Sequence, residues 1–158
     1  MIPVHLSISG FLSYQDTVEL DFSIFDLACI SGQNGAGKSS LLDAMTWVLF
    51  GQARRKDDAI INSHSDACKV VFDFEYEQHF YRIQRYKERD KTTQLEFNIQ
   101  TREGDWKPLT EHSLRETETR IEQVLRMDYE TFTNASFFLQ GKADQFAQQN
   151  PGARKGIL

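Results

Sequence analysis

The glycine-rich stretch at residues 32–40 constrains the fold more than any other part of the sequence. It reads Gly-Gln-Asn-Gly-Ala-Gly-Lys-Ser-Ser and fits the pattern G-x-x-x-x-G-K-[ST]. Gly32, Gly37, Lys38 and Ser39 occupy the four fixed positions of that pattern. A chain that carries it is expected to wrap its backbone around a phosphate group.

The residues on either side supply the secondary structure that this pattern requires. The apolar run at 25–30 predicts a buried strand, and apolar residues at helical spacing predict a helix over 39–50 that ends at Gly51. In a strand–turn–helix unit, the glycines let backbone N–H groups converge on an anion, and the helix N-terminus adds further donors. The sequence therefore predicts a nucleotide-phosphate site.

Particular roles follow from the positions within the pattern. Lys38 is expected to reach the β- and γ-phosphates of ATP, and the Ser39 hydroxyl is expected to bind Mg²⁺. Lys38 would also stabilise charge on the transferred phosphoryl group. The loop residues expected to bind the nucleotide are Asn34, Gly35, Ala36, Gly37, Lys38, Ser39 and Ser40. The expected cofactors are thus ATP and Mg²⁺.

The composition is that of one soluble domain rather than a basic nucleic-acid binder. The 158 residues carry a net charge of −5, so contact with DNA would need a local basic patch. No apolar stretch is long enough to span a membrane, and the N-terminus does not resemble a signal peptide. Cys29 and Cys68 both fall in apolar strand patterns and are expected to be buried thiols in a reducing cytoplasm.

Alternating apolar residues predict two groups of antiparallel strands. Segments 2–9 and 17–22 are expected to form a hairpin. Segments 68–76, 79–87 and 95–100, separated by short turns, predict a meander. Downstream, a helix is expected to end near Arg126. That helix is expected to start either at Thr110 or at a capping box formed by Ser113 and Glu116. After it, a short strand is expected over 136–139.

Two basic segments have two alternative interpretations. Arg54-Arg55-Lys56 follows the phosphate-loop helix, and five Lys or Arg residues lie in and after segment 79–87. A solvated face is the default interpretation for each. The alternative is contact with the phosphate backbone of DNA, which the aromatic residues interleaved in 79–87 weakly favour.

The sequence lacks a clear acidic partner for the phosphate loop. An ATPase of this type needs a carboxylate at a strand end to bind Mg²⁺, and usually a glutamate to polarise the attacking water. Asp73 and Glu75 follow apolar residues, but both alternate with aromatic side chains as in a strand with one wet face. They are therefore expected to face solvent, and the rest of the ATP site is expected to come from elsewhere.

Several segments together resemble the SMC-like coiled-coil ATPases, in particular the SbcC-type group of DNA double-strand-break repair. Residues 33–44 resemble the phosphate loop of that family, and residues 10–13 resemble the end of its first strand. Residues 127–132 and 138–146 resemble its approach to the Q-loop, with Gln140 at the Q-loop position. The resemblance covers nearly the whole chain.

This resemblance implies an α/β P-loop NTPase fold of the ABC type. The whole chain, 1–158, would be the N-terminal lobe of an ATPase head, with an antiparallel meander beside a central mixed sheet and the phosphate-loop helix. Gln140 would be a catalytic residue with Lys38, and it would bind Mg²⁺ and the attacking water. Ser13 and residues 62–64 would lie near the adenine and ribose, while Leu12 stands where relatives often have a basic residue.

The resemblance also implies partners. A coiled coil and a C-terminal lobe of the same protein would complete the head, and two heads would sandwich two ATP molecules. An SbcD-type nuclease and DNA would be the further partners, in the cytoplasm and on the nucleoid if the source is bacterial. Two alternatives remain: an SMC-type chromosome-organising head without a nuclease, and a self-contained P-loop NTPase that uses Asp73.

Overall fold

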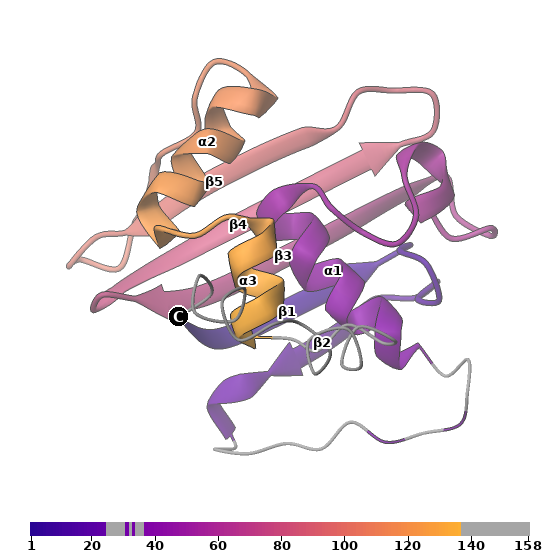
Figure 1. Cartoon of the computed structure of the whole chain (residues 1–158), viewed down its shortest axis with the longest axis horizontal. Helices are drawn as coiled ribbons and strands as arrows, with labels where there is room; N and C mark the ends of the chain where they lie inside the picture. The colour runs from indigo at the N-terminus through magenta and orange to yellow at the C-terminus, as the bar shows by residue number, and fades with distance from the viewer. Residues whose placement is uncertain (25–30, 32, 34–36, 137–158) are drawn as a thin grey trace, which may run out of the picture. The chain divides into compact units, whose positions relative to one another are not determined.

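The computed structural model describes residues 1–24, 31, 33 and 37–136 of the chain (Figure 1). It divides into two units, Met1–Leu125 and Arg126–Leu158, which are described separately. The expected strand over 25–30, which includes Cys29, and the expected Q-loop segment lie outside the described residues.

The first unit is built on a six-stranded antiparallel sheet with the order β2-β1-β3-β4-β5-β6. Its strands are β1 (Ile2–Ser9), β2 (Val18–Asp21), β3 (Ala67–Tyr76), β4 (His79–Glu88), β5 (Gln94–Gln100) and β6 (Trp106–Pro108). The expected hairpin and meander are both confirmed. The described meander lies in the same sheet as the hairpin, because β3 pairs directly with β1. No alternating pattern predicted β6, which has three residues.

Two helices cover one face of this sheet (Figure 1). Helix α1 (Lys38–Phe50) packs on β3 and β4, and α2 (Leu114–Leu125) packs on β5 and on α1. Two short 3-10 helices, Phe22–Ile24 and Asp57–Ile60, lie in the connections. None of the helices in the described part is long and apolar enough to cross a membrane.

The core lies between the sheet and α1. Leu6, Phe72, Ile83 and Phe97 pair in register across four neighbouring strands, and all four are fully buried. Cys68 lies on the same face of β3, and burial raises the pKa of its thiol to about 12. The expectation of a buried thiol is confirmed at this position.

Arg85 occupies a core position on β4, and the expected solvated face is wrong for this residue. Its neighbours in register are Val70 and Leu95, and only 1% of its surface is exposed. Its Nη1 donates to Glu118 Oε1 on α2 at 2.7 Å. Burial lowers the pKa of Arg85, and Glu118 acts in the opposite direction. The periodicity of β4 places this cation on the apolar face, where a carboxylate from α2 pairs with it.

The second of the two alternative starts for α2 is confirmed. Ser113 Oγ accepts the Glu116 backbone N–H at 3.2 Å and donates to the Glu116 carboxylate at 2.9 Å. The helix does not begin at Thr110, because that hydroxyl is bonded to the backbone of Phe97 on β5.

The second unit contains α3 (Tyr129–Ser136), which Asp128 caps through the Thr131 N–H. Ser136 therefore ends a helix rather than beginning the expected strand.

Candidate nucleotide-binding site

The N-terminus of α1 has the backbone geometry of an anion site. Gly37 precedes the helix in the left-handed conformation, with φ 91° and ψ 3°, and its carbonyl accepts the Leu41 N–H at 3.1 Å. Among the described residues, no side chain forms a capping hydrogen bond at this end, and the first turn contains no acidic residue. The N–H groups and positive dipole of the first turn are therefore suited to a phosphate.

Lys38 and Ser39, in the first turn, are partly exposed, whereas Ser40 is fully buried. The ammonium of Lys38 donates to the backbone oxygen of Gln33 at 2.8 Å, so the side chain reaches back toward the residues that precede the helix. A ligand at the start of α1 would thus meet Lys38 and Ser39 directly. It would meet Ser40 through the backbone, because the Ser40 hydroxyl points into the protein.

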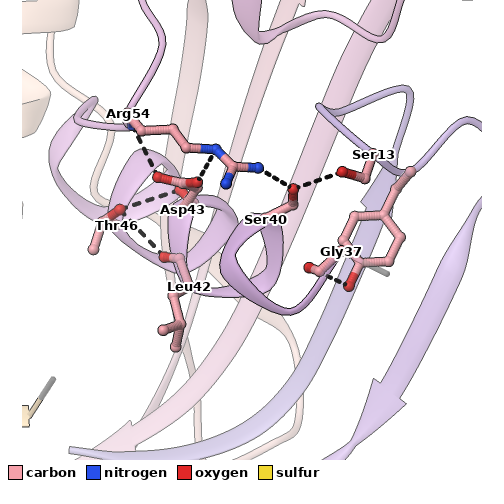
Figure 2. Close-up of polar contacts among 8 residues, drawn as sticks. Ser13, Gly37, Ser40, Leu42, Asp43, Thr46 and Arg54 are labelled. Atoms are coloured by element: carbon pink, nitrogen blue, oxygen red, sulfur yellow. Dashed lines mark hydrogen bonds and ion pairs between the residues drawn. The ribbon is translucent and has the colours of Figure 1, made fainter. Parts of the chain in front are cut away.

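The loop after β1 packs against this helix start (Figure 2). Ser13 Oγ and Ser40 Oγ are 2.9 Å apart, and the Tyr14 hydroxyl donates to the Gly37 carbonyl at 3.1 Å. A β-carbon on Gly37 would lie 3.4 Å from the Tyr14 ring. Burial raises the pKa of Tyr14, which keeps its hydroxyl protonated as a donor. The first turn of α1 is therefore held by side chains far away in the sequence.

Asn62 holds the same loop from its other side. Its Nδ2 donates to the Leu12 carbonyl at 2.6 Å, and its Oδ1 accepts the His64 backbone N–H at 2.9 Å. Leu12 has a φ of 47°, so it adopts a conformation that non-glycine residues rarely take. Ser13 lies against Ser40 and Asn62 against Leu12. Their expected place beside the adenine and ribose stays a prediction.

Arg54 reaches back to α1 from the loop that follows it (Figure 2). Its Nη2 donates to Ser40 Oγ at 2.6 Å, and its Nε lies 2.9 Å from Asp43 Oδ2. Its backbone N–H donates to Asp43 Oδ1, also at 2.9 Å. Burial raises the pKa of Asp43, while both contacts with Arg54 lower it. Sequence reasoning missed this residue, because nothing in the run Arg54-Arg55-Lys56 separates one cation from the next.

Asp73 does not join the helix start. It lies on the face of β3 opposite Phe72 and Phe74, and its carboxylate binds Arg82 on β4 through Oδ1 to Nε at 2.7 Å and Oδ2 to Nη2 at 2.6 Å. The expectation that Asp73 faces solvent holds for the face of the strand on which it lies, but its carboxylate is paired with Arg82 and only 14% of its side chain is exposed. Its part in a self-contained NTPase loses support, because the carboxylate is bound to an arginine.

The part of the chain that the structure describes contains no group of three or more His, Cys, Asp or Glu residues placed to hold a metal. Of the described residues, Ser39 is the expected Mg²⁺ ligand, and nucleotide phosphates would be among the other ligands of the ion. Five of the expected contacts lie outside the described residues: Gly32, Asn34, Gly35, Ala36 and Gln140.

The AAA domain family matches residues 5–155, nearly the whole chain. The chain belongs to this family. Among curated relatives, it is 32% identical to the SbcC component of the SbcCD nuclease of Deinococcus radiodurans and 31% identical to its counterpart in Bacillus subtilis. It is 29% identical to the "Probable DNA double-strand break repair Rad50 ATPase" of Aquifex aeolicus. Each match includes all of this chain, but the chain spans only 15–18% of those relatives.

Solved structures share the fold. The SMC head domain from Thermotoga maritima superposes with a TM-score of 0.55 at 23% identity, over 76% of this chain and 42% of that one. The recombination mediator RecF bound to ATP gives a TM-score of 0.51 at 16% identity, over 67% of this chain and 27% of RecF. The expected P-loop ATPase fold is therefore confirmed.

Proposed function

We propose that this chain is the ATP-binding N-terminal lobe of an SbcC-like ATPase head. The observation that carries the proposal is the start of α1. A left-handed glycine leads directly into Lys38 and Ser39, which are both partly exposed, and within the described ranges no side chain forms a capping hydrogen bond there. The similarity to SbcC and Rad50 proteins extends over the whole of this chain, which supports the assignment to this group rather than to P-loop proteins in general.

In this proposal, the described residues bind and orient the nucleotide. Lys38 binds the β- and γ-phosphates, and the N–H groups from Lys38 to Ser40 receive phosphate oxygens. Ser39 places its hydroxyl on Mg²⁺, which neutralises phosphate charge. From beyond the described residues, we assign Asn34, Gly35 and Ala36 to the same cradle, and Gln140 to Mg²⁺ and the attacking water.

The remaining parts of the site would come from outside this chain. A C-terminal lobe of the same protein would supply the acidic residues, and a second head would close over the nucleotide. Because the γ-phosphate contacts both heads only in the closed state, ATP would favour head dimerisation. We propose that this cycle controls the access of an SbcD-type nuclease to DNA ends in double-strand-break repair in the cytoplasm.

The test is the Lys38→Ala substitution in the full-length protein. Losing the ammonium removes charged hydrogen bonds to the phosphates, so MgATP should bind at least about a hundredfold more weakly in calorimetry. Lys107→Ala is the matched control, because Lys107 is exposed on β6. Equal MgATP affinities for wild type and Lys38→Ala would contradict the proposed function.

A further inference from the structure

Arg54 ties the loop after α1 to the first turn of that helix. Its guanidinium contacts Ser40 at 2.6 Å and Asp43 at 2.9 Å, and its backbone N–H binds the same carboxylate (Figure 2). Ser40 and Asp43 are three residues apart, so they lie on one face of the helix. A single side chain therefore fixes two positions at the end of α1 that faces the phosphate loop.

Ser40 extends this network to the loop after β1. A serine hydroxyl has one hydrogen to donate, and the Ser40 oxygen already accepts a hydrogen bond from Arg54. The Ser40 hydroxyl also forms a hydrogen bond with Ser13 Oγ, 2.9 Å away, in which either oxygen can donate. Ser40 is fully buried, while Arg54 and Ser13 approach it from the exposed side, so both hydrogen bonds are partly buried. Arg54, Ser40 and Ser13 form a continuous chain across the first turn.

We propose that Arg54 is a positioning residue of the nucleotide site. Acting through Ser40 and Asp43, it holds Lys38 and Ser39 in the arrangement that receives phosphate. The inference rests on the proposed function, since it assigns a further residue to the same site. Without Arg54, the first turn keeps its phosphate-binding groups but must be ordered when the nucleotide binds, which weakens affinity.

The first experiment measures MgATP affinity and steady-state ATPase kinetics of the full-length protein. Arg54→Ala should weaken binding about tenfold and raise KM more than it lowers kcat. Arg54→Lys should restore part of the loss, because one ammonium cannot bond Ser40 and Asp43 as a planar guanidinium does. Arg55→Ala is the control: Arg55 is an exposed neighbour of the same charge, and its removal should leave affinity unchanged.

The second experiment separates action through Ser40 from direct contact with the nucleotide. Ser40→Ala keeps the backbone N–H and removes the hydroxyl that Arg54 binds. If Arg54 acts in part through this hydroxyl, the Arg54→Ala/Ser40→Ala double variant should lose less MgATP affinity than the sum of the losses in the two single variants. Additive losses would overturn the inference, since Arg54 would then act by another route.

Failure of this inference can be told from failure of the proposed function. If Lys38→Ala loses MgATP binding while Arg54→Ala binds like wild type, only the role of Arg54 is overturned. If Lys38→Ala binds normally, the proposed function itself is overturned. Should Arg54→Ala fail to fold, Arg54→Lys and Ser40→Ala still decide the matter, because both must then weaken MgATP binding and Arg55→Ala must not.

Discussion

Gly37 is the residue at which the local backbone most directly serves the proposed site. Its φ of 91° lies in the region that side chains with a β-carbon rarely adopt, and the Tyr14 ring and Ser13 lie close to where that carbon would be. The left-handed turn aims the first N–H groups of α1 outward. The backbone conformation therefore favours glycine at this position.

Gly37→Ala should separate stability from binding when it is compared with Gly104→Ala. Both glycines have left-handed φ values, 91° and 93°, so each substitution should cost about 1 kcal/mol of unfolding free energy. A β-carbon on Gly104 would meet nothing within 4 Å, and on Gly37 it would make only ordinary contact with Tyr14, but Gly37 directly precedes the first turn of α1, so its backbone strain falls on the proposed site. Only Gly37→Ala should therefore lose MgATP affinity.

Chemical denaturation and calorimetry on the full-length protein measure the two quantities. A loss of affinity in Gly104→Ala as large as in Gly37→Ala would show that general destabilisation, and not the geometry at the helix start, controls binding.

The site could be predicted from sequence wherever a local pattern fixes the residue. Lys38 and Ser39 follow from a motif, and Gly51 follows from its place at the helix end, where it has a φ of 68° and its N–H bonds Trp47 O at 2.8 Å. Arg54 and Arg85 could not be predicted, because their roles depend on partners brought together by tertiary packing. A basic residue in a loop or strand carries no local sign of such a partner.

At the scale of elements, α1 is fixed at both ends by long-range contacts. Its N-terminal turn meets the loop after β1, and its C-terminal end meets Arg85, whose Nε donates to the Val48 carbonyl at 3.4 Å. The guanidinium also lies 5.8 Å from the centre of the Trp47 ring. A cation at the C-terminal end of α1 interacts favourably with the helix dipole. Arg85 is thus a buried charge at which α1, β4 and α2 meet.

Glu118→Ala should strongly destabilise this junction. It would leave the Arg85 guanidinium buried without its carboxylate, which should cost about 3 kcal/mol of unfolding free energy. Glu122→Ala on the same helix is the matched control, because Glu122 is exposed and should change stability by less than about 0.5 kcal/mol. Chemical denaturation measures both, and equal losses would mean that the ion pair does not stabilise the fold.

At the scale of the whole molecule, the sheet and its two covering helices position one side of the proposed ATP site. The hairpin, the meander and the phosphate-loop helix were all predictable, because period-two and helical patterns are strong in those segments. The joining of β1 to β3 was not, since pairing between strands far apart in sequence leaves no local pattern. The same holds for the contacts that bring Asn62 to Leu12.

We expect the 158-residue chain alone to hydrolyse ATP at a negligible rate, whereas the proposed function requires that the full-length protein hydrolyse it. The physical reason is that the acidic residues and the opposing head of the proposed site lie outside this chain. A phosphate-release assay with Lys38→Ala as the blank measures the rate. The opposite result would be an isolated chain that matches the full-length protein in rate and loses that rate in Lys38→Ala. That result would contradict the expectation, because one lobe would then suffice for ATP hydrolysis.

The placement of β1 between β2 and β3 has a consequence for how the chain folds during synthesis. When β1 and β2 leave the ribosome, β1 can form hydrogen bonds along only one of its edges, because its other neighbour follows α1 in the sequence. Until β3 is made, that edge stays open, and α1 lacks the strand surface on which it packs. The nascent phosphate-loop helix must therefore wait for the meander before it is held in place, and translation itself delays the assembly of the site.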